Sequence, residues 1–428
     1  MLKKYLHFTL FIMLFTSSLM AVEFSGFSIN KIGMIPFMIG AFAALLRNGR
    51  VSISPKERIY ILFLLASCIS ATIGLIHPII RIDDLPQTFV KYLLQVFFLY
   101  IPLVLFVSGN LGNKYELQDS FSTQIIYIAR IHALFIIVQF IFYIALGINI
   151  SSIIFDDVFR GITNVNWNSF VYGSTKVIRA SGLNRDPAFA SYIMMCGFVF
   201  DKSKVFRWLY IICPILAQSR TGFVVLIILA MLTVFQDEKK RKRIRELMPR
   251  LMGTFVGLII VLLSMRWNEA LSKQMDSIIE RILDLFNTSG RDISTIRHLF
   301  YPKWAIKTWA SFGDIFYWIF GIGPRTSGLA FIRNISITSN YLSANMRNSI
   351  WAVECDFAEL LLGYGLLGLG IYYYFLFTLT RDKKREVKLA GIAMIIMSIM
   401  YDYSSITFNV IIIAFMILLS RREAFSDD

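Results

Sequence analysis

The sequence predicts an all-α integral membrane protein with about twelve transmembrane helices. Its 428 residues are 56% hydrophobic and have a mean hydropathy of +0.62, which is far more apolar than a soluble domain with a surface to solvate. Apolar stretches that could cross a bilayer recur along the chain, with short basic loops between them. One long segment, 267–352, is too polar to cross a membrane although it lies between stretches that must.

The predicted spans follow the apolar stretches, and short ones are accepted where two helices can meet at a buried turn. In chain order they are 5–22, 30–46, 58–76, 88–107, 122–147, 187–200, 205–218, 220–236, 248–266, 356–380, 389–402 and 405–420. The N-terminal run resembles a signal peptide, but no small-residue cleavage site follows it. We therefore expect a retained first helix and one polytopic membrane domain over residues 1–428.

Basic residues mark the loops that lie in the cytoplasm if Lys3 and Lys4 do. These loops carry Arg47, Arg50, Lys56, Arg58, Lys114, Lys202, Lys204, Arg207, Lys239 to Arg245, Arg381 to Arg385, Arg421 and Arg422. Both termini are therefore predicted to be cytoplasmic. The run from Lys239 to Arg245 could be a nucleic-acid patch in a soluble protein, but a loop that sets membrane orientation explains it here. No nucleic acid is expected as a partner.

This topology leaves two long segments outside, 149–186 and 267–352. Long loops are translocated whatever their charge, so their arginines are not orientation signals and indicate substrate binding instead. We call the second segment the cap. It is predicted to open with an amphipathic helix along the membrane surface, with Leu271 and Ile278 on the apolar face. A second helix is expected after Pro302.

The first candidate motif is Arg179-Ala-Ser-Gly182-Leu-Asn-Arg185-Asp-Pro187, which ends the earlier outer loop and enters a span with proline at a helix start. The second is Gln218-Ser-Arg220-Thr-Gly222 between two short spans, where an arginine at membrane depth is costly and usually functional. A helix N-terminus beside a guanidinium suits a phosphate group. Turns with arginines that reach lipid headgroups are the alternative for both motifs.

The third candidate combines Arg291 and Arg297 of the cap with the acids that follow it. These acids are Glu354, Asp356 and Glu359, ahead of Gly363, Gly365 and Gly368. On a helix Asp356 and Glu359 share a face, whereas Glu354 and Asp356 point to nearly opposite sides, so the three cannot all serve one reacting group. The alternative is that they only cap and solvate a helix start.

These motifs, in this order, resemble the superfamily of Wzy-type polysaccharide polymerases and O-antigen ligases. The matching pattern is Arg-x-Ser-Gly…Asp-Pro, Ser-Arg-Thr-Gly, Ser-Gly-Arg…Trp in a large loop, Gly-Ile-Gly, and Val-Glu-x-Asp…Gly-x-x-Gly, and it covers roughly Arg179 to Gly368. The ligase branch has a histidine near the start of the span after the large loop. This chain has Glu354 and Asp356 there, which favours the polymerase branch.

The resemblance implies a GT-C-like, metal-independent glycosyltransferase of the bacterial inner membrane that polymerises undecaprenyl-pyrophosphate-linked repeat units of O-antigen or capsular polysaccharide at the periplasmic face. It implies that Arg179, Arg220 and Arg291 hold the donor pyrophosphate; Arg185 and Arg297 are added on chemical grounds only. No cofactor is expected. The implied partners are the lipid-linked oligosaccharides, membrane lipids, a chain-length-determining co-polymerase and a flippase.

The chemistry is reasonable without a metal, because a sugar bonded to pyrophosphate carries its own leaving group and a cationic clamp can stabilise the departing charge. A carboxylate then takes the acceptor proton, with Glu354 ranked before Asp356 as the base. An O-antigen ligase that uses a lipid A core acceptor, a flippase for the same lipid-linked sugar and a purely structural role in an assembly complex stay open. The four cysteines show no paired spacing, so neither a disulfide framework nor a zinc site is indicated.

Overall fold

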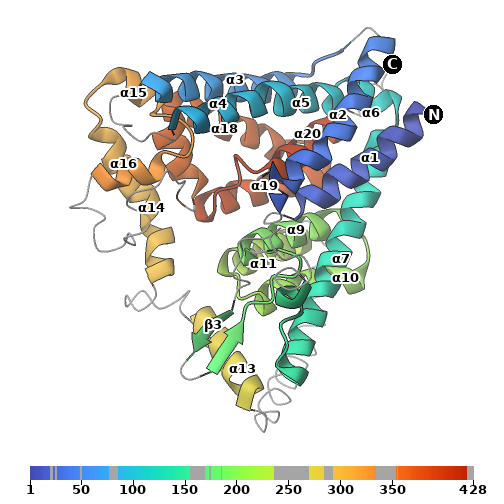
Figure 1. Cartoon of the computed structure of the whole chain (residues 1–428), viewed down its shortest axis with the longest axis vertical. Coiled ribbons are helices and arrows are strands. Elements are labelled where there is room, and N and C mark those ends of the chain that lie inside the picture. The colour runs from blue at the N-terminus through green and yellow to red at the C-terminus, as the bar shows by residue number, and fades with distance from the viewer. Residues whose placement is uncertain are drawn as a thin grey trace. The chain divides into compact units, whose positions relative to one another are not determined.

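The computed structural model describes residues 1–19, 23–24, 27–48, 51–76, 85–154, 169–172, 175–184, 186–235, 269–283, 293–333, 353 and 355–421. Among them the chain is mostly helical, with two short antiparallel hairpins (Figure 1). They group into two compact units, and α7 passes from one to the other. Unit 1 comprises 1–18, 30–124 and 289–428, and unit 2 comprises 19–29 and 125–288.

Unit 1 contains the helices from both ends of the chain. They are α1 (Leu2–Ser17), α2 (Ile29–Asn48), α3 (Pro55–Ile76), α4 (Leu85–Gln95), the π-helical turn η1 (Val96–Tyr100), α5 (Ile101–Ser108), α6 (Asn110–Lys114), α14 (Ile293–Ala310), α15 (Ile315–Phe320), α16 (Ser327–Arg333), α18 (Asp356–Thr380), α19 (Arg385–Met400) and α20 (Thr407–Arg421). Helix α18 packs on both α3 and α19, and α20 packs on α5. Segments far apart in sequence thus form one helical body (Figure 1).

Unit 2 is built on the middle of the chain. It contains the hairpin β1 (Glu23–Phe24) and β2 (Phe27–Ser28), most of α7 (Leu117–Leu146), α8 (Ile150–Ser152), the hairpin β3 (Ser169–Tyr172) and β4 (Thr175–Ile178), α9 (Pro187–Phe200), α10 (Lys204–Leu216), α11 (Arg220–Phe235) and α13 (Glu269–Leu283). Helix α9 packs on α10 and α11, and α13 packs on β4. The first large loop therefore leads through a hairpin into the helical part of the unit.

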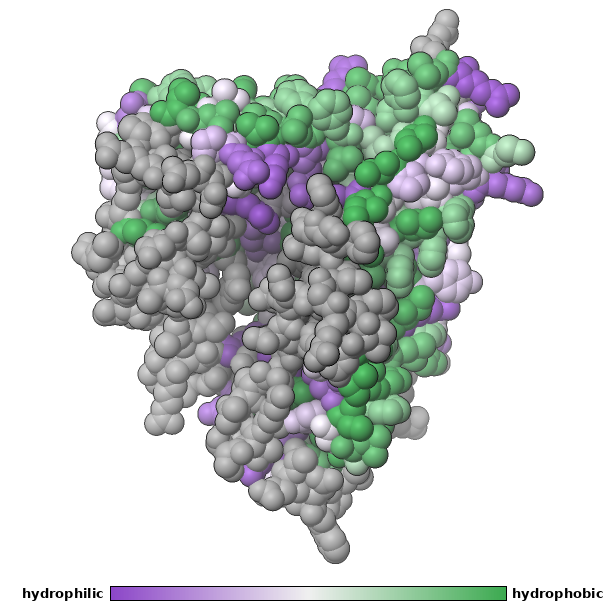
Figure 2. Space-filling model, in the orientation of Figure 1, coloured by the Kyte–Doolittle hydropathy of each residue, from purple (hydrophilic) through white to green (hydrophobic). Residues whose placement is uncertain are grey.

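Five helical segments of the described chain are long and apolar enough to cross a membrane. They are Ile29–Arg47, Pro55–Ile76, Pro86–Ser108, Leu117–Leu146 and Asp356–Thr380, and shorter apolar helices cover Pro187–Phe200, Arg220–Thr233 and Thr407–Arg421. Apolar side chains cover α3, α4 and α5 on the face drawn in Figure 2. The chain is an all-α membrane protein in its main architecture. A helix lies at each predicted span except 248–266, which falls outside the described residues.

Three local expectations need correction. The hairpins β1–β2 and β3–β4 were not predicted, because strands this short leave little alternation to detect. Helix α14 begins at Ile293 rather than after Pro302, so the proline lies within the helix. The covered face of α13 is partly polar, since Gln274 and Ser277 are buried beside Leu271 and Ile278. That face packs on β4. The predicted apolar face of α13 is therefore covered by the protein and is not free to contact lipid.

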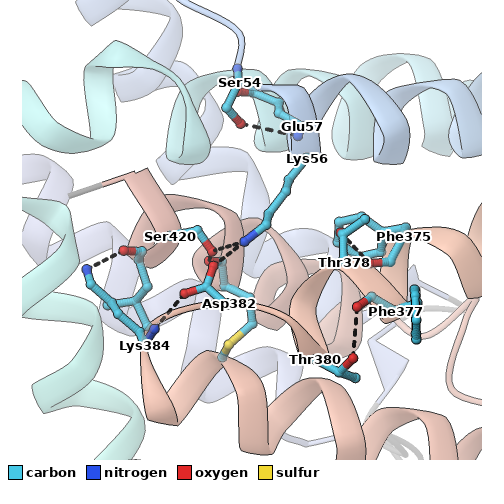
Figure 3. A network of polar contacts seen from close by, with 12 residues as sticks. Ser54, Lys56, Glu57, Phe375, Phe377, Thr378, Thr380, Asp382, Lys384 and Ser420 are labelled. Atoms are coloured by element: carbon cyan, nitrogen blue, oxygen red, sulfur yellow. Dashed lines mark hydrogen bonds and ion pairs between the residues drawn. The ribbon is translucent and has the colours of Figure 1, made fainter. Parts of the chain in front are cut away.

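One end of unit 1 is held by ion pairs between three helix ends (Figure 3). Lys56 at the start of α3 contacts the carboxylate of Asp382, just after α18, and donates to Ser420 Oγ of α20 over 3.3 Å. Burial opposes ionisation of Asp382, but hydrogen bonds from Lys56, Ser420 and the Lys384 N–H hold its pKa below its usual value. Basic residues predicted to be cytoplasmic therefore gather at this end.

Candidate functional site

Two of the predicted motifs meet in unit 2, at a turn that we call the arginine turn (residues 217–220). Arg179 follows β4 directly, and its Nη2 donates to the carbonyl of Gln218 over 3.4 Å. Gln218 has a φ of +52°, which turns the chain from α10 into α11, and Arg220 is the first residue of α11. Arg179 and Arg220, separated by 41 positions, therefore flank the same turn, and both side chains are half-buried.

The glycines and the Asp-Pro pair of these motifs are required by the local structure. A Cβ on Gly222 would lie 2.2 Å from Ser191 Cβ, so only glycine lets α11 approach α9 this closely. Gly182 has a φ of +67°, which favours glycine, and its N–H donates to Gln139 Oε1 over 2.9 Å. Asp186 caps α9 by accepting from the Ala188 N–H, with Pro187 as the first helical residue. The predicted helix start at Pro187 is confirmed.

Helix α13 of the cap fastens the arginine turn. Gln274 accepts from the Ile178 N–H over 3.1 Å and donates to the Ile178 carbonyl over 2.5 Å. Ser277 Oγ donates to Gln218 Oε1 over 3.3 Å, and Gln218 Nε2 donates to the Ile178 carbonyl over 3.3 Å. Both α13 residues are fully covered. The polar atoms that α13 buries thus hold the backbone of Ile178, immediately before Arg179, and the side chain of Gln218 in the arginine turn.

A second polar cluster lies in unit 1 at the start of α18. Glu359 is 1% exposed, and its carboxylate accepts from the Arg325 N–H and, over 2.5 Å, from Ser327 Oγ. It therefore holds the turn that leads into α16. Asp356 is also 1% exposed, and its Oδ1 accepts from the Tyr403 N–H over 3.0 Å and the Ser404 N–H over 2.7 Å. It holds the turn between α19 and α20.

Asp402 completes this carboxylate cluster. It lies in the α19–α20 turn, shares a hydrogen bond with the Asp356 carboxyl and interacts electrostatically with Glu359. Two carboxyls that share a hydrogen bond hold a proton between them, because two ionised groups in contact repel. Arg325 is exposed and attracts the charge of Asp402. Acids from α18 and the α19–α20 turn thus meet one cation of the cap.

The glycines around this cluster allow two irregular backbones to touch. Helix α18 is interrupted at Gly365, with a φ of +66°, and the Ile322 and Gly323 N–H groups donate to the carbonyls of Leu362 and Gly363 over 3.0 and 2.9 Å. A Cβ on Gly365 would lie 2.3 Å from the Ile319 carbonyl oxygen. The predicted span 356–380 is thus one helical segment with a kink at Gly365. The carbonyls that the kink leaves without a helical partner accept hydrogen bonds from the Gly-Ile-Gly segment, because backbone polar groups inside a membrane must be paired within the protein.

Buried tyrosines extend the polar region between α3, α4, η1, α18 and α20. Tyr92 and Tyr364 have their hydroxyls 3.2 Å apart. Tyr100 donates to the Ser405 carbonyl over 3.1 Å and lies 3.3 Å from Thr407 Oγ1. Tyr60 and Tyr372 are also fully buried, and both interact electrostatically with Asp356. Hydroxyl groups such as these could bind sugar hydroxyls or relay protons.

The structure describes only part of the predicted site. Arg179, Arg220 and Asp356 have described side chains; Arg297 lies in α14, but only its backbone is described; Arg185, Arg291 and Glu354 lie outside the described residues. The expected common face of Asp356 and Glu359 is consistent with their shared neighbour Asp402. Sequence reasoning missed Asp402, because its contact with Asp356 joins residues 46 positions apart. No group of acids, histidines or cysteines suited to a metal occurs among the described residues.

A comparison of the sequence with known protein families and with curated proteins finds no match.

Proposed function

We propose that this chain is a membrane-embedded, metal-independent glycosyltransferase that polymerises undecaprenyl-pyrophosphate-linked oligosaccharide repeat units, with a GT-C-like arrangement of about twelve spans. The observation that carries the proposal is the arginine turn. Two arginines from separate motifs flank one turn next to the N-terminus of α11, and a cap helix bonds the backbone of Ile178 before Arg179 and the side chain of Gln218 in the turn. Guanidinium groups at a helix N-terminus suit a pyrophosphate.

The carboxylate cluster, which belongs to unit 1, is taken by itself as the candidate for a second requirement of the reaction. Transfer of a glycan from pyrophosphate needs charge stabilisation on the leaving group and a base for the acceptor hydroxyl. Carboxyls at the start of α18 and in the α19–α20 turn, with tyrosine hydroxyls beside them, provide candidates for the base and for sugar binding. Arg185, Arg291 and Arg297 remain proposed pyrophosphate ligands, and Glu354 remains a proposed base.

The test is deletion of the gene in its native host, followed by separation of the surface glycan on a gel. Polymerase activity predicts loss of the ladder while a single repeat stays attached to the lipid A core, because attachment does not need this chain. Re-expression of the intact chain should restore the ladder, and empty vector should not. Loss of all attachment would contradict the proposal and indicate a ligase or a flippase.

The proposed orientation is cytoplasmic termini in the bacterial inner membrane and a periplasmic cap. It is supported by the gathering of Lys56, Lys384 and Arg421 at one end of unit 1, with the carboxylate cluster at the opposite end of α18. Reporter fusions after Lys240 and after Asn287 should give opposite signals, because only this orientation keeps the basic loops inside. Identical signals at the two positions would reject it.

A further inference from the structure

We propose that Asp402, in place of Glu354, is the carboxylate that removes the proton from the acceptor hydroxyl. The inference rests on the proposed transferase function and names a catalytic residue for it. Among the described residues, three carboxyls meet at the start of α18, and the reaction needs one that an incoming hydroxyl can reach. Their burial and hydrogen bonds distinguish them.

Asp356 and Glu359 are occupied by the fold. Each is 1% exposed. Asp356 Oδ1 accepts from the backbone N–H groups of Tyr403 and Ser404, and the Glu359 oxygens accept from the Arg325 N–H and the Ser327 hydroxyl. A carboxylate whose lone pairs face backbone donors in a covered site is a poor base for an external hydroxyl. These two residues position the turns around them.

Asp402 differs in both respects. It is partly exposed, accepts a 3.4 Å hydrogen bond from Ser404 Oγ and shares a hydrogen bond with Asp356. Asp356 in turn fixes the turn that carries Asp402 by holding the N–H groups on its C-terminal side. Arg325, exposed on the neighbouring turn, attracts the Asp402 carboxylate. Among the described acids of the cluster, Asp402 is the most exposed.

The transfer step balances with this assignment. The acceptor O–H bond breaks, and its proton passes to the Asp402 carboxylate. The acceptor oxygen forms a bond to the anomeric carbon of the donor sugar, while the bond from that carbon to the pyrophosphate oxygen breaks. The lipid pyrophosphate leaves with the electron pair, and water then takes the proton from Asp402.

The experiment uses the purified full-length chain in detergent, with lipid-linked single repeats extracted from a host strain that lacks the gene. Asp402→Asn should lower kcat by about 10²–10⁴ with little change in KM. Wild-type kcat should fall at low pH as the base becomes protonated, and the variant should lack this acid limb. Within the described part of the chain, charged and titratable groups that interact with Asp402 include Asp356, Glu359, Cys355 and Tyr364 on the α18 side and Arg325 in the cap.

Asp356→Asn is the discriminating variant. Its amide oxygen can still accept from both backbone N–H groups and its amide nitrogen can donate to Asp402, so kcat should fall by less than about tenfold. The exposed aspartate Asp119, changed to Asn at the start of α7, should leave kcat and KM unchanged. If Asp402→Asn fails to accumulate, Asp402→Ser takes its place with the same expectation.

The outcomes separate the two proposals. A wild-type chain that does not lengthen the lipid-linked repeat rejects the transferase function itself. An active wild type whose folded Asp402 variant stays within tenfold, or keeps the acid limb, overturns the role of Asp402 alone. Equal loss in the folded Asp356 and Asp402 variants would also overturn it, because it would place the base at Asp356.

Discussion

Arg220→Lys is expected to lower polymer formation by about 10²–10³ at normal protein level, the loss seen when one charge-stabilising donor is removed. Lysine keeps the positive charge but replaces a planar fork that grips two phosphate oxygens with a point charge on a flexible stem. Arg220 is half-buried at the first position of α11, and the Ser219 hydroxyl accepts from the Gly222 N–H over 3.3 Å, so the helix start is capped independently of its side chain. The exchange should therefore leave the fold intact.

The matched control is Arg58→Lys in α3. Arg58 is exposed and was assigned to a loop where only charge sets orientation, so its exchange should be silent. Both variants are compared by glycan ladder and by turnover of the lipid-linked repeat, after quantification in membranes. An Arg220→Lys chain as active as the control would show that positive potential alone suffices, and the pyrophosphate contact proposed at Arg220 would be withdrawn.

Hydrophobicity located the helices well, because a membrane span must be apolar along its whole length. It could not find the break at Gly365, where the residues on both sides remain apolar and only backbone contacts with Gly321 and Gly323 show the interruption. The strands of the hairpin β3–β4 are too short to show alternation, but the residues between them carry a separate turn signal. These strands are joined by Gly173-Ser174, a two-residue turn signal between short β-branched and aromatic runs.

The motifs of the candidate site could be predicted from the sequence, but the residues that they contact elsewhere in the chain could not. The arginine motifs could be recognised in the sequence because charges at membrane depth are costly. The neighbouring residues do not indicate that Arg179 donates to Gln218 or that Gln274 donates to Ile178. Asp402 was placed at the end of a predicted span, and its importance depends on Asp356, a contact set by the packing of α18 against α19. Long-range packing of this kind leaves no periodic trace in a single sequence.

The second large effect is expected on stability, in the buried ion pair of Glu57 with Arg421. This pair lies toward the end of α18 that is remote from the carboxylate cluster. Glu57 Oε2 lies 3.0 Å from Arg421 Nη2, with side chains 0% and 7% exposed. Arg421 also donates to the Ser52 carbonyl over 2.6 Å. Glu57 forms a capping box with Ser54, accepting from the Ser54 N–H over 3.1 Å while its own N–H donates to Ser54 Oγ over 3.2 Å. One carboxylate thus serves both the helix start and the ion pair.

Arg421→Met should lower the free energy of unfolding by about 3–5 kcal/mol, because it leaves the Glu57 charge buried without its partner. Arg421→Met combined with Glu57→Gln should recover a substantial part of that loss, since glutamine keeps an oxygen for the Ser54 N–H and carries no charge. The two single variants and the double variant are compared by unfolding in detergent. Arg58→Met, a change at an exposed neighbour, should stay within about 0.5 kcal/mol. If the double variant instead loses the sum of the two single losses, the pair is not coupled, and the stability of this end must come from the apolar packing of α20.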